Sequence, residues 1–387
     1  MQLIEVKDSS TWKLFHKVPH LIYKGDSDWI CPLEKDVQNV FNPKKNKAFQ
    51  KGSAVCYVLL EGQKAIGRIA AFIDGARNEK QDFPTGGIGF FECINDQKAA
   101  FLLFQKAEDY LLENGIKAID GPINFGERDK FWGLYTKGTG SPYYQENYNP
   151  DYYQDFFTNW GFRPFEQILS FHSSLSSIDA PRLKRIADIS KKRYHLHCDS
   201  LSYKNPEKYA DDFCTLYNAA FKEYDHFKPL VRAQVLSIFM EMKPVADPFM
   251  VGFVYHNKLP VTMCAMMPEV NQFLRKANGK INFFTIPGFL FRKYWPNKKI
   301  IKGVAFGIHP DYRSKGGMAI IGDYFYDYAF KKYHSLVLTT IRGHNTKMVK
   351  SVFKLGVKIN KEHVAYRKML DKTLPFEPFD FFEVGDL

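Results

Sequence analysis

The stretch that decides the fold reads Gly307-Ile-His-Pro-Asp-Tyr-Arg-Ser-Lys-Gly-Gly-Met318. It follows a strand-length apolar run, Ile301–Ile308, and leads into Gly317–Tyr333, where apolar side chains recur at helical spacing. The turn between them carries Arg313, Lys315 and two glycines, so backbone N–H groups and the positive end of the helix dipole would face an anion there. The stretch predicts an α/β unit with a phosphate-binding turn, although an ordinary turn with solvated basic side chains has the same composition.

The segments around this unit predict a mixed, mostly antiparallel sheet flanked by helices. Upstream lie a strand at Tyr194–Leu201, helices at Pro206–Phe221 and Val231–Met242, and a hairpin formed by Phe249–Tyr255 and Leu259–Met266. Downstream lie a strand at Leu336–Ile341, a helix at Thr346–Lys354 and a last strand at His363–Met369.

The first half of the chain predicts the same order of elements. Its strands are expected at Leu3–Val6, Ala54–Leu60, Ala65–Ile73, Gly87–Ile94 and Ile116–Asp120, and its helices at Ser10–Leu21, with Ser9 and Ser10 as caps, and Asp96–Glu113. The Ser-rich segment Ser173–Ala180 is the expected linker. We therefore predict two domains, residues 1–180 and 181–387, with insertions at Pro122–Asn147 in the first and Gln272–Lys299 in the second.

Composition narrows the class of protein. The 387 residues are 45% hydrophobic and 25% charged, which is typical of chains that bury real cores. No apolar run has the length of a membrane span, and the start of the chain has no secretory pattern, so we expect a cytoplasmic protein without a membrane partner. The six cysteines are scattered, which favours free thiols and no metal site. Residues 301–370 hold 13 Lys or Arg against 4 Asp or Glu, so nine of the twelve net positive charges lie there and favour an anionic partner.

The basic turn resembles the acyl-CoA-binding motif of the GNAT superfamily of N-acyltransferases. Arg313-x-x-Gly316-x-Met318 matches the Arg/Gln-x-x-Gly-x-Gly/Ala pattern of that family, except that Met318 replaces a small residue. Asn345, eleven residues before Gly356, resembles the position that contacts the pantetheine arm, whereas Val352 stands where the family has a proton-donating Tyr. The resemblance implies that acetyl-CoA or CoA contacts the turn and its neighbours: Ile308, Arg313, Ser314, Lys315, Gly316, Gly317, Met318 and Asn345.

The first half resembles the same fold without the binding turn. Asn95-Asp96-Gln97-Lys98 stands at the equivalent place, and an acidic residue there opposes a phosphate. The stretches Gly121-Pro122-Ile123-Asn124 and Tyr148-Asn149-Pro150 resemble a pattern in tandem GNAT-like proteins of bacteria. We expect a degenerate domain that forms one wall of an acceptor cleft, with Trp132, Tyr135 and Tyr144 of the insertion lining it; such aromatic residues also commonly pack an insertion.

Direct acyl transfer to an amine requires a base, and two residues are candidates. Glu269 ends a hairpin strand and His309 follows the central strand, and either of them would equally fit a solvated structural role. We expect an acyl-CoA-dependent N-acyltransferase, acetyl being the expected group, acting on a small-molecule or peptide amine. Two alternatives stay open: a GNAT-like protein that binds a ligand without catalysis, and a Fem-type peptidyltransferase that uses aminoacyl-tRNA. The CoA-type turn disfavours the second alternative and nucleic acid in general.

Overall fold

A computed structural model describes residues 1–222, 229–295, 299–353, 356–383 and 385. The strands of the first half are β1 (Gln2–Glu5), β2 (Gly52–Glu61), β3 (Lys64–Asp74), β4 (Thr85–Cys93), β5 (Ala118–Gly121), β6 (Leu134–Gly138) and β7 (Arg163–Ser174). Its helices are α1 (Ser9–Ile22), α2 (Glu34–Val40), α3 (Gly75–Asn78), α4 (Gln97–Glu113) and α5 (Tyr153–Asn159), with single turns at η1 (Lys47–Gln50) and η2 (Leu175–Ser177).

The second half continues the pattern. Its strands are β8 (Leu196–Ser200), β9 (Val251–His256), β10 (Leu259–Pro268), β11 (Lys299–Ile308), β12 (Tyr333–Arg342) and β13 (Lys358–Met369). Its helices are α6 (Ala180–Tyr194), α7 (Pro206–Phe221), α8 (Arg232–Met242), α9 (Asn271–Leu274), α10 (Ile286–Tyr294), α11 (Gly317–Lys332) and α12 (Thr346–Phe353), with single turns at η3 (Pro248–Met250) and η4 (Pro310–Tyr312). Lys354, the expected end of α12, lies outside the described residues.

The strands form one continuous sheet in the order β1-β2-β3-β4-β5-β13-β7-β12-β11-β10-β9-β8, and β6 pairs with β13 beside this path. Each half contains one parallel pair, β4 with β5 and β11 with β12, and all other pairs are antiparallel. The repeat expected from the order of elements is therefore present, and the two copies share one sheet. Domain boundaries at 1–180 and 181–387 stay a prediction.

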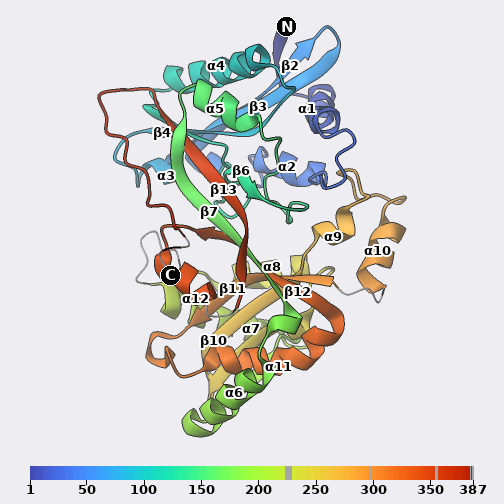
Figure 1. The fold of residues 1–387 in the computed structure, drawn as a ribbon, viewed down its shortest axis with the longest axis vertical. Helices are drawn as coiled ribbons and strands as arrows, with labels where there is room; N and C mark the ends of the chain where they lie inside the picture. The colour runs from blue at the N-terminus through green and yellow to red at the C-terminus, as the bar shows by residue number, and fades with distance from the viewer. Residues whose placement is uncertain (223–228, 296–298, 354–355, 384, 386–387) are drawn as a thin grey trace.

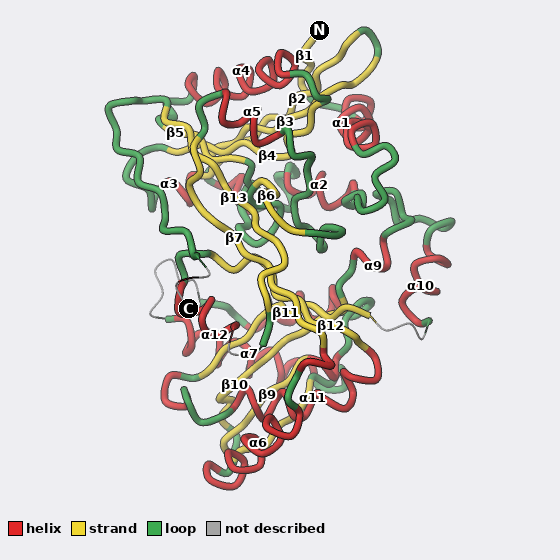
Figure 2. The backbone as a smooth tube through the Cα atoms, in the orientation of Figure 1, coloured by secondary structure: helices red, strands yellow, loops and turns green. Residues whose placement is uncertain are grey.

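The two halves exchange strands at the centre of the sheet. β13, the last strand of the second half, pairs with β5 of the first half, and β7, the last strand of the first half, pairs with β12 of the second. β7 and β13 pair with each other from His172↔Lys358 to Arg163↔Arg367. Figures 1 and 2 show these two long strands running side by side from one half of the molecule into the other.

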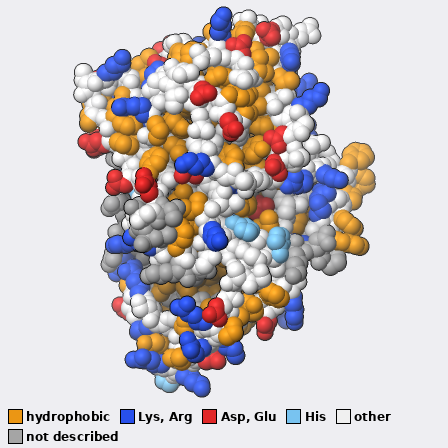
Figure 3. Space-filling view, in the orientation of Figure 1, with side chains coloured by type: hydrophobic (Ala, Val, Ile, Leu, Met, Phe, Trp, Pro, Cys, Tyr) orange, Lys and Arg blue, Asp and Glu red, His pale blue; other side chains and the backbone are white. Residues whose placement is uncertain are grey.

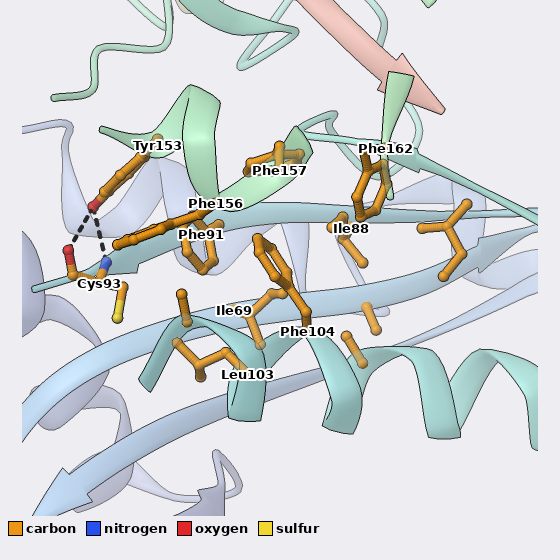
Figure 4. Close-up of a cluster of buried hydrophobic side chains, with 14 of the residues drawn as sticks. Ile69, Ile88, Phe91, Cys93, Leu103, Phe104, Tyr153, Phe156, Phe157 and Phe162 are labelled. Atoms are coloured by element: carbon orange, nitrogen blue, oxygen red, sulfur yellow. Dashed lines mark hydrogen bonds between the residues drawn. The ribbon is translucent and has the colours of Figure 1, made fainter. Parts of the chain in front are cut away.

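Helices cover both faces of each half. In the first half α4 and α5 pack on one face and α1 packs on the other. The stripe Ala100, Phe104, Ala107 and Leu111 of α4 is fully buried, as its helical spacing predicts. Figure 4 shows Phe104 among the aromatic rings of this core, with Tyr153 of α5 hydrogen-bonded to the backbone of Cys93. In the second half α6 and α11 cover one face, and α7 and α8 cover the other.

Two local expectations are wrong. Helix α1 is capped by Asp8, whose carboxylate accepts the Ser10 and Thr11 N–H groups, rather than by Ser9 or Ser10. The segment 173–180 is not a linker, because Ser173 and Ser174 end β7 and pair with β12, and η2 follows at once. Strand β7 was missed because its partners come from the distant second half of the chain. Its Ser-rich end pairs with β12 and Ser173 is buried there.

A buried ion pair joins β13 to β5. Arg367 donates to both carboxylate oxygens of Asp120 at 2.6 and 2.9 Å, and Arg77 bonds the same group. Burial raises the pKa of Asp120, but Arg77 and Arg367 outweigh burial, so the pKa lies below its usual value.

The described part of the chain contains no helix that is long and apolar enough to cross a membrane.

We expect Arg367→Leu to lower the free energy of unfolding by about 3 kcal/mol, because it leaves Asp120 buried with one cation fewer. Lys358→Leu, an exposed position on the same strand, should change it by less than about 0.5 kcal/mol. Calorimetry should show both halves melting in one transition that shifts as a whole. Two transitions, only one of which moves, would contradict the shared sheet as the source of cooperativity.

Candidate functional site

Strands β11 and β12 part in the middle of the sheet. They pair only as far as Gly303↔Leu338, although β11 continues to Ile308 and β12 to Arg342. At the same level β11 bulges against β10, and Val304 in the bulge is 53% exposed. The β11–β12 ladder therefore ends before the strands do. We call this parting of the two strands the notch; it lies at the carboxyl ends of two parallel strands, which is where α/β sheets commonly bind ligands.

The turn after β11 lies at the same end of the strand. Arg313 and Ser314 are exposed, and Lys315 lies over the Tyr312 ring at 4.1 Å. Ser314 has φ of +67° and Gly316 has φ of +78°, so two residues of the turn are left-handed, a conformation found in turns that bind anions through backbone N–H groups. The Lys315 N–H donates to the Tyr312 carbonyl at 3.2 Å.

Helix α11 begins at Gly317 directly after the turn, and no side chain caps it. The N–H groups of its first turn therefore have no side-chain acceptor, and the helix dipole places partial positive charge at the same point. Together with Arg313 and Lys315 this end of α11 has the chemistry of an anion site.

Close packing is a second reason why residues 316 and 317 are glycines. A Cβ on Gly316 would overlap Ser190 of α6, and a Cβ on Gly317 would overlap Thr262 of β10. Thr262 is 1% exposed and its hydroxyl has no hydrogen-bond partner among the described residues. The glycines thus let the start of α11 lie against β10 and α6, beside an unused buried hydroxyl.

The remaining expected contact residues surround the same notch. Ile308 is the last residue of β11, and Met318 packs half-buried against the core beneath α11. Asn345 follows β12 and is exposed, and its side-chain oxygen accepts the Met348 N–H at 3.2 Å, which caps α12. Val352, at the position of the family's Tyr, is 1% exposed. The structure places no proton donor there.

The equivalent helix of the first half is already capped. Asp96 precedes α4, and its carboxylate accepts the Lys98 and Ala99 N–H groups at 2.8 and 3.2 Å. A carboxylate thus occupies the donors that an incoming phosphate would use. The two halves therefore share a fold and differ in whether the start of this helix is free.

The two candidate bases lie far apart. His309 follows β11, and its ring is half-buried and accepts the Asp311 N–H. Glu269 lies beyond the other end of the β10–β11 ladder, where its N–H bonds Ile300. At roughly 3.3 Å per residue, it lies about 20 Å or more from Ile308 along the strand. The two side chains cannot act on the same atom.

Glu269 belongs to the contact between the halves. It is 3% exposed, and its carboxylate accepts the Tyr144 N–H at 2.6 Å and the Gln272 N–H at 3.1 Å. The half-buried Lys302 donates to the Tyr144 carbonyl at 3.3 Å. Burial raises the pKa of Glu269 and lowers that of Lys302. The arrangement holds the insertion of the first half against β10 and β11.

The aromatic residues expected in the acceptor cleft occupy different environments. Tyr144 is half-buried and donates to Asp36 at 2.6 Å, and the ring of Tyr135 stacks on Tyr148. Trp132 is 5% exposed and donates to Glu166 at 3.1 Å. Solvent barely reaches Trp132, whereas Tyr135 and Tyr144 keep part of their surface open.

The two insertions contact each other. Arg275 donates to the Ser141 hydroxyl, and Tyr144 packs in a small apolar cluster with Leu274 and Phe289. The charged cluster of Glu166, Arg128 and Arg342 around Trp132 was not predicted from the sequence. No local pattern indicates it, because the three residues come from three distant segments of the chain.

Metal ligands are not grouped in the described part of the chain. No three His, Cys, Asp or Glu side chains there could hold one ion together. His195 ends α6 in a left-handed conformation, and Cys198 packs on the core beneath α11.

No family model matches the chain. It is 22% identical to protein YghO of Escherichia coli over 368 residues, which are 92% of this chain and 93% of the relative. It is 24% identical to a bacterial ceramide synthase of Caulobacter vibrioides over 303 residues, 76% of each chain.

The solved structures show the fold. A tandem GNAT protein from the clavulanic acid biosynthesis pathway aligns over 95% of this chain and 98% of its own, with a TM-score of 0.54 and 10% identity. A GCN5-related glucosamine N-acetyltransferase region of a fungal β-N-acetylglucosaminidase aligns over 95% of this chain and 38% of that one, with a TM-score of 0.55 and 11% identity. The chain therefore spans well under half of that larger protein. The predicted fold class, two tandem GNAT-like domains around mixed sheets, is confirmed.

A buried pair links the insertion to β13 and makes stability depend on pH. Lys361 donates to Glu146 at 2.9 Å, and both side chains are nearly inaccessible. Burial raises the pKa of Glu146, but Lys361 and then His363 outweigh it and lower the pKa from 4.5 to about 2. This stabilisation is present above pH 4.5 and is lost as the pH falls toward 2.

We therefore expect Glu146→Gln to cost about 3 kcal/mol of unfolding free energy at neutral pH, and less as the pH falls below 4.5. Denaturant titrations at several pH values measure this difference. Glu127→Gln, an exposed carboxylate of the same insertion, is the matched control. A penalty that is the same at pH 3 and pH 7 would show that the charge of Glu146 does not stabilise the contact.

Proposed function

We propose that this protein is an acyl-CoA-dependent N-acyltransferase and that its second half, residues 181–387, holds the acyl-CoA. The observation that carries the proposal is the uncapped start of α11 beside the parted strands β11 and β12. The free N–H groups at the start of this helix would donate hydrogen bonds to an anion of the size of a pyrophosphate. The tandem GNAT fold supports the proposal, since it is the fold of acetyltransferases among the structures compared.

The residues of the turn have distinct tasks in this proposal. Arg313 and Lys315 supply charge to the phosphates, and Ser314, Gly316, Gly317 and Met318 supply backbone N–H groups. Ile308 supplies a strand N–H for the thioester carbonyl, and Asn345 borders the notch from the β12 side. These side chains and N–H groups fit acetyl-CoA or CoA, because they offer donors and almost no competing carboxylate: only Asp311 stands in the turn.

The reaction is a direct transfer. The acceptor amine attacks the thioester carbonyl, the C–S bond breaks, and CoA leaves as a thiolate that takes up a proton. His309 is the better placed of the two candidate bases, because it follows β11 at the mouth of the notch. Glu269 is enclosed between the halves, so its role in the proposal is to position the insertion. Residues 1–180 supply the acceptor wall through Tyr135, Tyr144 and the backbone around Trp132.

Activity assays with two donor–acceptor pairs test which acyl group and which amine the protein uses. The first pair is acetyl-CoA with a small-molecule or peptide amine. The second pair is a long-chain acyl-CoA with an amino-alcohol lipid, because one relative is named bacterial ceramide synthase and ceramide is an amide lipid. Release of free CoA thiol with each pair measures turnover. If the protein binds CoA but releases no CoA thiol with either pair, the non-catalytic ligand-binding alternative is favoured. The observation behind this alternative is that the buried Val352 stands where the family has a proton-donating Tyr. A thermal shift with tRNA in place of CoA would favour the Fem-type alternative.

We expect Arg313→Ala to weaken CoA binding about 10- to 150-fold, equivalent to about 1.5–3 kcal/mol for one charged donor to phosphate. Gly316→Asp should abolish binding, because it adds a carboxylate and strains a left-handed residue. Lys98→Ala, at the start of the equivalent helix α4, is the matched control and should bind as the parent does. Titration calorimetry gives the affinities, and an unchanged affinity in both turn variants would refute this site.

A further inference from the structure

Residues 281–295 expose an unusual amount of apolar surface. Phe283 and Phe284 are 83% and 88% exposed, and six more large apolar side chains in this segment are at least 41% exposed. We call the eight residues the aromatic knob: Ile281, Phe283, Phe284, Ile286, Leu290, Phe291, Tyr294 and Trp295. Contiguous apolar patches on soluble proteins commonly mark binding surfaces.

The knob points away from the body of the protein. In α10, Phe289 packs on Phe273 of α9 with ring centroids 5.7 Å apart, and Arg292 donates to the Phe273 carbonyl at 2.8 Å. Ile286, Leu290 and Tyr294 recur every four residues and form the outward stripe. Helix α10 is therefore held by one side and bare on the other. Figure 1 shows it standing out from the body beside α9.

Positive charge accompanies the knob. Residues 270–310 contain eight Lys or Arg and no Asp or Glu. Lys276 and Lys280 are exposed, and Lys280 makes an ion pair with Glu34 at 3.4 Å. Arg275 and Lys293 donate to uncharged groups, namely the Ser27 carbonyl and Ser141 hydroxyl for Arg275 and the Pro244 carbonyl for Lys293. Arg275, Lys276, Arg292 and Lys293 make no ion pair with a carboxylate in the described part of the chain.

The convex shape of the aromatic knob favours a deformable partner surface over a rigid partner with a complementary pocket. Figure 3 shows the apolar side chains of this edge as a protruding lobe with Lys and Arg side chains beside it. A convex apolar and aromatic surface with cations beside it matches the interfacial region of an anionic bilayer, where apolar groups enter the acyl boundary and cations meet the headgroups. Phe, Tyr and Trp are the residues that such interfaces favour.

We propose that the aromatic knob docks this protein onto the surface of an anionic lipid bilayer. The proposal does not depend on the proposed acyl transfer, because it concerns adsorption alone. The absence of an apolar run that could span a bilayer led us to expect no membrane partner. A helix that lies in the interface needs no such run.

The test is sedimentation of the full chain with phosphatidylcholine vesicles, with and without phosphatidylglycerol. The chain should bind the vesicles that contain phosphatidylglycerol, and added salt should weaken binding. The variant Phe283→Ser/Phe284→Ser/Phe291→Ser should bind at least about a hundredfold more weakly, since burying each Phe side chain contributes on the order of tenfold. Lys276→Gln/Lys280→Gln should weaken binding by about tenfold or more.

The control variant is Leu102→Ser/Leu112→Ser, which removes two exposed apolar side chains from α4. It should bind vesicles as the parent does, and all variants should keep the parent's melting temperature because the altered side chains are exposed. Three results would overturn the proposal: no vesicle binding by the parent, equal binding by the triple variant, or equal binding to pure phosphatidylcholine. A parent dimer in light scattering that the triple variant loses, without vesicle binding, would assign the knob to a second copy.

Discussion

The pairing of β7 with β13 is the constraint on which the rest of the structure depends. These strands end the two halves of the chain, and each lies beside the parallel pair of the other half. Every backbone N–H and C=O that they bury must be paired, so neither half can complete its sheet alone. The exchange fixes the halves relative to each other and explains why the buried pairs Asp120–Arg367 and Glu146–Lys361 both end on β13.

The same exchange sets the surroundings of the notch. β7 occupies the free edge of β12, so β12 is held in place beyond Leu338 without help from β11. β11 can then turn away at its bulge and deliver the basic turn to the start of α11. The contact between Glu269, Lys302 and Tyr144 holds the insertion of the first half close to the base of this arrangement. The parting of β11 from β12 is the result.

The two halves share a fold but differ in whether the start of the equivalent helix is free to bind an anion. Helix α4 satisfies its first N–H groups with Asp96, whereas α11 leaves them free behind a turn with Arg313 and Lys315. The difference was readable in the sequence, because a capping carboxylate and a Gly-Gly pair have opposite consequences for an anion at a helix start. The exclusion of Trp132 from solvent was not readable, because it depends on Glu166 and Arg342, which lie on β7 and β12.

The sequence by itself determined most of the local elements, since hydrophobic periodicity and turn residues act over a few neighbouring residues. It predicted both hairpins, helices α4, α7 and α11, and the basic turn, and it indicated the repeat. It missed β7 and misread Ser173–Ala180 as a linker. Only the tertiary structure decided the strand exchange, the parting of β11 from β12 and the burial of Glu269. The reason is that the hydrogen-bond partners of these residues lie far away in the sequence, and no local pattern records them.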